Sequence, residues 1–144
     1  MKSKSVKLTV AIIVVIFLSI TIGTITVFAS TSHSGSVVGG TYQMNLTRTR
    51  ASTGVGIADG YTGTATVSLA EWTMRNPTNG ATTTLVGGTN SRSGPGSAYH
   101  FATVDRPTPP TGFTSHLAMR SRHTASGSQP ATGNSTSHTM LLMD

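Results

Sequence analysis

The sequence predicts a small all-β protein, an antiparallel β-sandwich or open barrel of five to seven short strands. Threonine and serine occur 22 and 15 times in residues 30–144, and β-branched threonine favours an extended backbone. Apolar and polar residues alternate with a period of two in several short segments, which is typical of half-buried strands. Stretches rich in Gly, Pro and Asn separate these segments. No 12-residue stretch of residues 30–144 carries the apolar stripe of a helix.

The clearest predicted strand is residues 62–75, TGTATVSLAEWTMR. Its first half alternates around Val67, but the large apolar residues of its second half, starting at Trp72, fall on the opposite parity. A β-bulge near residues 70–71 would return both halves to one face, because an extra residue resets the alternation. The NPTNG that follows is turn chemistry, so the segment and residues 81–86 are predicted to form a hairpin.

Three further strands are predicted, at residues 41–50, 98–105 and 113–120. In residues 98–105, Tyr99 and Phe101 share one face and smaller apolar residues take the other. The stretches between these strands are predicted loops because they are rich in glycine and proline. These are residues 87–97 and 106–112.

These strands define a β domain over residues 30–120. Residues 121–138, SRHTASGSQPATGNSTSH, contain no apolar residue larger than alanine, which is typical of a polar low-complexity linker. Residues 139–144, TMLLMD, are predicted to be an apolar C-terminal strand. We expect this strand to dock on the protein's own sheet, the alternative being a donor strand that completes a neighbouring subunit.

The first 29 residues predict export. Three lysines precede a long uncharged apolar stretch that ends in Val-Phe-Ala, the pattern of a secretory signal peptide cleaved after Ala29. The stretch is also long enough to remain as an uncleaved membrane anchor. In either case the expected location is secreted or at the extracellular cell surface, and the membrane is contacted only through this N-terminal segment during export.

Without the N-terminal lysines, residues 30–144 carry seven arginines against four carboxylates, a formal net charge of +3. This charge allows attraction to anionic polymers of the cell envelope, and another protein subunit is the second kind of partner expected. The arginines are scattered, whereas a nucleic-acid surface needs a clustered basic stripe, so nucleic acid is not an expected partner. The absence of cysteine excludes disulfides, thiolate metal sites and cysteine nucleophiles.

No catalytic, cofactor-binding or metal-binding residue is predicted. The five histidines show no HxH or HExxH spacing, and His116 and His123, seven residues apart, are expected on opposite faces of a strand. A GxSxG nucleophile motif is absent. None of the four carboxylates lies in a recognisable hydrolase motif, namely Asp59, Glu71, Asp105 and Asp144.

Three aromatic residues, Trp72, Tyr99 and Phe101, are the candidate binding surface. Exposed aromatic side chains make platforms on which sugar rings stack. The alternative, which we favour, is that the few aromatic residues of a cysteine-free domain are needed for its core.

Residues 97–104, SAYHFATV, resemble secreted bacteriocins of the lactococcin type over these eight positions, and no residue role is carried over from them. The favoured function is that of an exported, non-enzymatic β protein that acts at or outside the cell surface by binding or assembly. The alternative is a secreted, bacteriocin-like antimicrobial or toxin protein.

Overall fold

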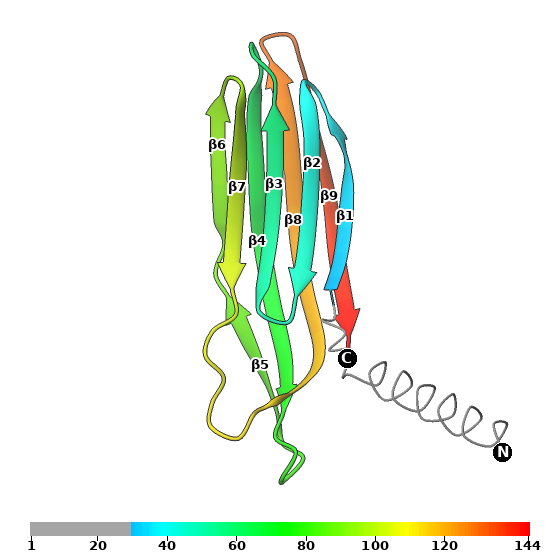
Figure 1. The fold of residues 1–144 in the computed structure, drawn as a ribbon, viewed down its shortest axis with the longest axis vertical. Coiled ribbons are helices and arrows are strands. Elements are labelled where there is room, and N and C mark those ends of the chain that lie inside the picture. Colours follow the sequence, from blue (N-terminus) through cyan, green and yellow to red (C-terminus); the bar gives the residue numbers. More distant parts are fainter. Residues whose placement is uncertain (1–29) are drawn as a thin grey trace, which may run out of the picture.

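The computed structural model describes residues 30–144, and the predicted signal peptide over residues 1–29 lies outside the described residues. The described chain is all β, as predicted, and no part of it is a helix long and apolar enough to cross a membrane. Its strands are nine rather than five to seven (Figure 1): β1 (Ser30–Val37), β2 (Gly40–Thr47), β3 (Arg50–Ile57), β4 (Thr62–Arg75), β5 (Thr82–Gly87), β6 (Asn90–Pro95), β7 (Ala98–Asp105), β8 (Ser115–Gln129) and β9 (Thr132–Met143).

The strands form two antiparallel sheets that face each other. The front sheet has the order β1-β2-β3-β7, and the back sheet has the order β5-β4-β8-β9 (Figure 1). Strand β4 is long enough to hold two partners along one edge. Strand β6 pairs with its first half and β5 with its second half. Every described strand pairing is antiparallel.

One hydrophobic core lies between the two sheets. Alternate residues of β2, β4, β7 and β8 point into it, and the largest fully buried side chain is that of Trp72. Methionine supplies much of the volume, since its flexible thioether fills irregular gaps between strands of small residues. The other large buried side chains of this core come from both sheets: Met44, Leu46, Val55, Val67, Met74 and Met119.

The predicted hairpin is confirmed as β4 and β5. The buried residues of β4 also change from odd-numbered to even-numbered positions along the strand, as predicted. The register with β8 shifts between Val67 and Leu69, so the irregularity lies at Ser68, just before the predicted position at residues 70–71. The shift keeps Val67 and Trp72 on the buried face. The turn after β4 ends at Gly80, whose φ of 74° suits glycine.

Residues 121–138 are not a linker, contrary to the prediction. They form the second half of β8 and most of β9, which pair with each other along their whole length. The inward positions of this part of β8 are Ser121, His123, Ala125 and Gly127, and a Cβ added to Gly127 would overlap the carbonyl oxygen of Val38. The residues look like a linker in sequence because the side chains that point inward here are small or polar and none is a large apolar residue. Met140 on β9 is buried at 5% exposure, so the C-terminal residues dock on the protein's own sheet.

Three strands occur where the sequence indicated no strand or a loop. Strand β6 lies inside the predicted loop over residues 87–97, and β1 and β3 were not predicted. All three are rich in Ser, Thr and Gly, so they carry few of the large apolar residues that mark a buried face. Backbone hydrogen bonds to neighbouring strands hold them in the sheets: β6 pairs with β4, β1 pairs with β2, and β3 pairs with both β2 and β7.

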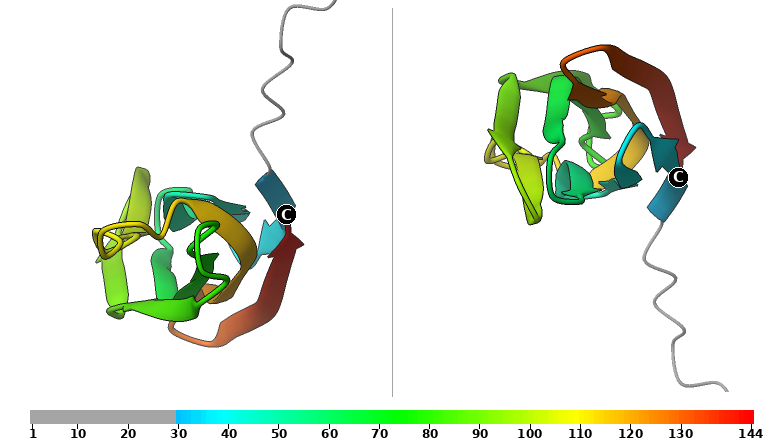
Figure 2. Two further views of the ribbon diagram at one scale, coloured as in Figure 1. Left: turned by 90° about the horizontal axis from the view of Figure 1, so that it is seen from below. Right: turned by 90° about the horizontal axis from the view of Figure 1, so that it is seen from above.

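The two sheets meet along two seams. At one seam a tight turn joins β6 of the back sheet to β7 of the front sheet, and the Asn90 side chain donates to the Thr103 carbonyl at 2.7 Å. At the other seam β1 and β9 lie side by side (Figure 2). Side chains of β9 close this seam, since Asn134 accepts from the Val38 backbone N–H at 2.7 Å and the ring centroids of His33 and His138 lie 3.7 Å apart.

Candidate functional site

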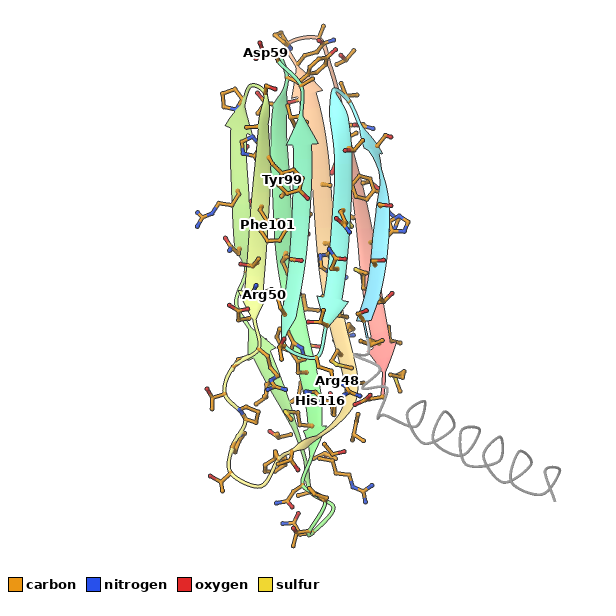
Figure 3. All side chains as sticks on the ribbon, viewed as in Figure 1. Arg48, Arg50, Asp59, Tyr99, Phe101 and His116 are labelled. Atoms are coloured by element: carbon orange, nitrogen blue, oxygen red, sulfur yellow. The ribbon has the colours of Figure 1, made fainter. Side chains whose placement is uncertain are left out.

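Tyr99 and Phe101 lie on the outer face of the front sheet. Both belong to β7, whose alternate residues Ala102 and Val104 point into the core, so the two aromatic rings must point outward. Their side chains are 59% and 45% exposed, and they are the large exposed apolar residues of this face among residues 30–144. Figure 3 shows the two rings one above the other along β7. The outward direction, which the sequence left open, is set by Ala102 and Val104, which take the inward positions farther along β7.

The two rings form one continuous aromatic platform. Their centroids lie 6.1 Å apart and their planes differ by 27°, so the two rings are close to parallel. Strand β3 supplies glycine opposite each ring, because Gly54 pairs with Phe101 and Gly56 with Tyr99. A Cβ added to Gly54 would overlap the Tyr99 hydroxyl, so the Tyr99 ring lies across this glycine. Because these glycines have no side chain, the Tyr99 ring has room to lie against the sheet.

Hydroxyl and amide side chains surround the platform. Gln43 and Thr41 of β2 pair with Gly54 and Gly56, and the outward serines of β1 follow beyond them. Two open hollows border Tyr99 on this side, with volumes of about 510 and 520 Å³. One of them is lined by polar side chains of three strands, among them Ser34, Thr41 and Gln43. The face therefore combines flat aromatic surface with closely spaced hydrogen-bonding groups.

An ion pair lies farther along the same face. Arg50 Nε donates to Asp105 Oδ1 at 2.6 Å, and this bond and the carboxylate charge raise the pKa of the Arg50 guanidinium. Arg50 and Asp105 are the cross-strand partners at the end of β3 and β7. A hollow of about 470 Å³ adjoins the pair and is also lined by Arg106. This end of the face can therefore accept a charged group.

Trp72 is not part of the candidate surface. Its side chain is fully buried, and its indole N–H donates to the Thr47 carbonyl oxygen at 3.1 Å. The bulge at Ser68 turns Trp72 toward the core, where its one polar atom finds a backbone acceptor. The core interpretation is therefore confirmed for Trp72, whereas Tyr99 and Phe101 are exposed and their role as a binding surface stays a prediction.

The histidines do not form a metal centre in the described part of the chain: no group of three or more His, Cys, Asp or Glu side chains gathers there. His116 and His123 do not lie on opposite faces, contrary to the prediction. Both contact residues of the front sheet or its loops, His116 reaching Arg106 and His123 reaching Thr53. The reason is a second register shift, which leaves the residue after His116 without a partner on β4.

A serine–histidine pair occurs, but it is sealed inside the core. Ser121 Oγ lies 2.6 Å from His123 Nε2, and both residues are fully buried. A nucleophile must reach its substrate, and no substrate can reach this hydroxyl. The pair is therefore a structural element of the core.

Sequence reasoning missed the glycines of β3, Gly54 and Gly56. Their spacing of two residues inside STGVGI was a usable signal, because glycine in a strand often marks a place where another group approaches closely. It could not be assigned to Tyr99, since the pairing of β3 with β7 joins distant parts of the chain.

The chain matches no protein-family model, no curated protein and no solved structure. Because a fold alone does not imply a function, the function has to be argued from the geometry of the site.

Proposed function

We propose that the protein is an exported, non-enzymatic binding protein that acts at or outside the cell surface, and that its front sheet binds polysaccharide chains. The observation that carries the proposal is the pair of exposed, nearly parallel rings, Tyr99 and Phe101, beside the glycines of β3. A sugar ring has an apolar face and a polar rim. The aromatic platform offers flat apolar surface to the apolar face of the sugar. The hydroxyl and amide groups beside it offer hydrogen bonds to the polar rim.

The shape of the site favours a chain over a small molecule. The hollows beside Tyr99 are open, and the polar groups extend over β1 and β2 instead of converging in a closed cavity. The net positive charge of residues 30–144 adds long-range attraction to acidic polymers of the cell envelope. The Arg50–Asp105 end of the face lies on the path of a chain that follows β7. An acidic polysaccharide is therefore the favoured ligand.

Binding of purified residues 30–144 to neutral and acidic polysaccharides, measured by affinity electrophoresis and calorimetry, tests the proposal. Replacing Tyr99 and Phe101 together by alanine is expected to weaken binding about tenfold or more, which corresponds to at least roughly 1.4 kcal/mol. The matched control is Thr139→Ala, an exposed change on the back sheet. An unchanged affinity in the double variant, or no binding to any polysaccharide by the parent protein, would refute the proposal. Growth inhibition of related bacteria by the same protein would instead support the antimicrobial alternative.

A further inference from the structure

A second apolar surface lies on the opposite side of the molecule. Among residues 30–144, five large apolar side chains are prominently exposed, and three of them belong to the back sheet: Val86, Leu141 and Met143, at 58%, 59% and 67%. They lie on β5 and β9, the two outer strands of the lower half of this sheet (Figure 1). Exposed apolar side chains gathered on one face indicate an interaction surface.

An ion pair lies between these apolar residues. Arg120 Nε and Nη2 both donate to Glu71 Oε2, at 3.0 and 2.7 Å. Glu71 on β4 pairs with Val86 on β5, and Arg120 on β8 pairs with Leu141 on β9. Since cross-strand partners point to the same face, the outer face of the back sheet carries one row across four strands. Its order is Val86, Glu71, Arg120, Leu141: apolar, acidic, basic, apolar.

This order is self-complementary. A two-fold axis that lies in the contact plane, runs along the strands and passes between β4 and β8 reverses the row on the facing copy. Glu71 then faces Arg120 of the second copy, and Val86 faces its Leu141. The neighbouring row reads Thr84, Thr73, Ala118, Met143 and places Met143 over small residues of the other copy. A symmetric dimer interface has to be complementary to itself in this way.

We propose that the outer face of the back sheet binds a second copy of this chain, with the two back sheets packed face to face. Within each copy Glu71 and Arg120 are already paired, so the dimer converts two exposed ion pairs into one network of four charges between apolar residues. Charges of this kind fix the register of an interface, and the apolar residues on both sides exclude water from it.

The dimer leaves both front sheets free and pointing in opposite directions. Each front sheet carries its Tyr99–Phe101 platform on its outer face. This face lies on the side of the fold opposite to the proposed interface. Such a dimer presents two equal surfaces that cannot both contact the same side of one flat target. It would therefore join two separate chains or particles instead of binding one of them twice.

Sedimentation velocity on residues 30–144, which contain all nine strands and the whole core, tests the dimer. We expect a dimer in the micromolar range that Leu141→Arg converts to a monomer. Val86→Arg is a second variant with the same expected result, and both positions are exposed enough to tolerate the change without loss of the fold. The control is Phe101→Arg on the front sheet, which should remain dimeric. A monomeric parent protein, or a dimer that both back-sheet variants preserve, would overturn the proposal.

Mixing two charge-reversed variants separates a contact between copies from the ion pair within one copy. Glu71→Arg places arginine against arginine in its own dimer, and Arg120→Glu places carboxylate against carboxylate, so each variant alone is expected to be monomeric. In a mixture every facing pair is opposite in charge, and native mass spectrometry should find a heterodimer. Circular dichroism verifies that both variants are folded. If the mixture stays monomeric while both variants are folded, this two-fold arrangement is wrong.

Discussion

Thr53 Oγ1 lies 2.8 Å from His123 Nδ1 inside the core, and this contact determines where the imidazole proton sits. The Thr53 hydroxyl donates its hydrogen to the Thr66 carbonyl oxygen at 2.9 Å, so it can only accept from His123. His123 Nδ1 therefore carries the proton, and Nε2 is left to accept from the Ser121 hydroxyl at 2.6 Å. Both ring nitrogens of this buried group are thus satisfied with the imidazole neutral.

The fold is therefore expected to lose stability in mild acid. Burial, and then the nearby His138, lower the pKa of His123 to about 4, below its ordinary value of 6.5. Between these pH values the unfolded chain holds a proton that folded His123 does not. The free energy of unfolding should thus decrease as the pH falls from 6.5 toward 4, with a limiting slope of about 1.4 kcal/mol per pH unit for one proton.

Urea unfolding at pH 7, 6, 5 and 4 measures this slope. His116 contributes in the same direction, because burial and then the charge of Arg106 also lower its pKa. His123→Gln removes the larger part of the dependence, since glutamine can donate and accept but does not titrate. His116→Gln is the matched variant and should keep the part due to His123. An unchanged slope in His123→Gln would show that His123 is not the titrating group.

The environment of His123 could not be predicted from sequence, because Thr53 and His123 meet only once the front and back sheets are packed. Strands such as β4 and β7 could be predicted, since apolar residues recur along them with a period of two. The second half of β8 could not, because its inward residues are Ser121, His123, Ala125 and Gly127. These buried residues are small or polar and none is a large apolar residue, so the composition suggests a linker.

The candidate site was predictable to a similar degree. Alternation placed Tyr99 and Phe101 on one face, but the choice between core and surface depended on which parity of β7 faces the back sheet. Ala102 and Val104, though smaller, fill that position. Val104 packs so closely that a Cβ added to Gly87 would overlap its side chain, and the imidazole ring of His100, on the same parity, lies over Gly94.

Trp72 is expected to be the most costly side chain to truncate. It is fully buried and its indole N–H is bonded to the Thr47 carbonyl. Trp72→Ala should lower the free energy of unfolding by about 3–5 kcal/mol through lost contacts and the cavity left behind. Tyr99→Ala, an equally drastic change at an exposed aromatic position, should cost about 1 kcal/mol or less. Equal losses in the two variants, measured by urea unfolding, would contradict this assignment.

Gly54→Ala tests the platform without removing an aromatic ring. The added Cβ would overlap the Tyr99 hydroxyl, so the ring has to lift from the sheet or rotate away. We expect weaker polysaccharide binding with both aromatic residues still present. Gly88→Ala is the matched control, since no atom lies within 4 Å of the Cβ that it adds. If calorimetry finds the same affinity in both variants, the position of the Tyr99 ring does not matter for binding.

Met140 and Leu141 are adjacent on β9 but point to opposite faces, so they separate folding from assembly. Met140 is 5% exposed and packs in the core, whereas Leu141 is 59% exposed on the outer face of the back sheet. Met140→Ala is expected to lower the free energy of unfolding by about 2–5 kcal/mol and to leave a dimer of unchanged mass. Leu141→Arg is expected to give a monomer whose intrinsic stability changes by about 0.5 kcal/mol or less.

Association itself stabilises a folded protein by mass action, so the two unfolding free energies must be compared where both proteins are monomeric. Unfolding at decreasing protein concentration meets this condition: the deficit of Leu141→Arg relative to the parent protein should vanish on dilution, because only the contribution of the dimer is missing. The deficit of Met140→Ala should persist, because a cavity in the core does not depend on concentration. A Leu141→Arg deficit that survives dilution would place Leu141 in the fold of the single chain and remove it from the interface between copies.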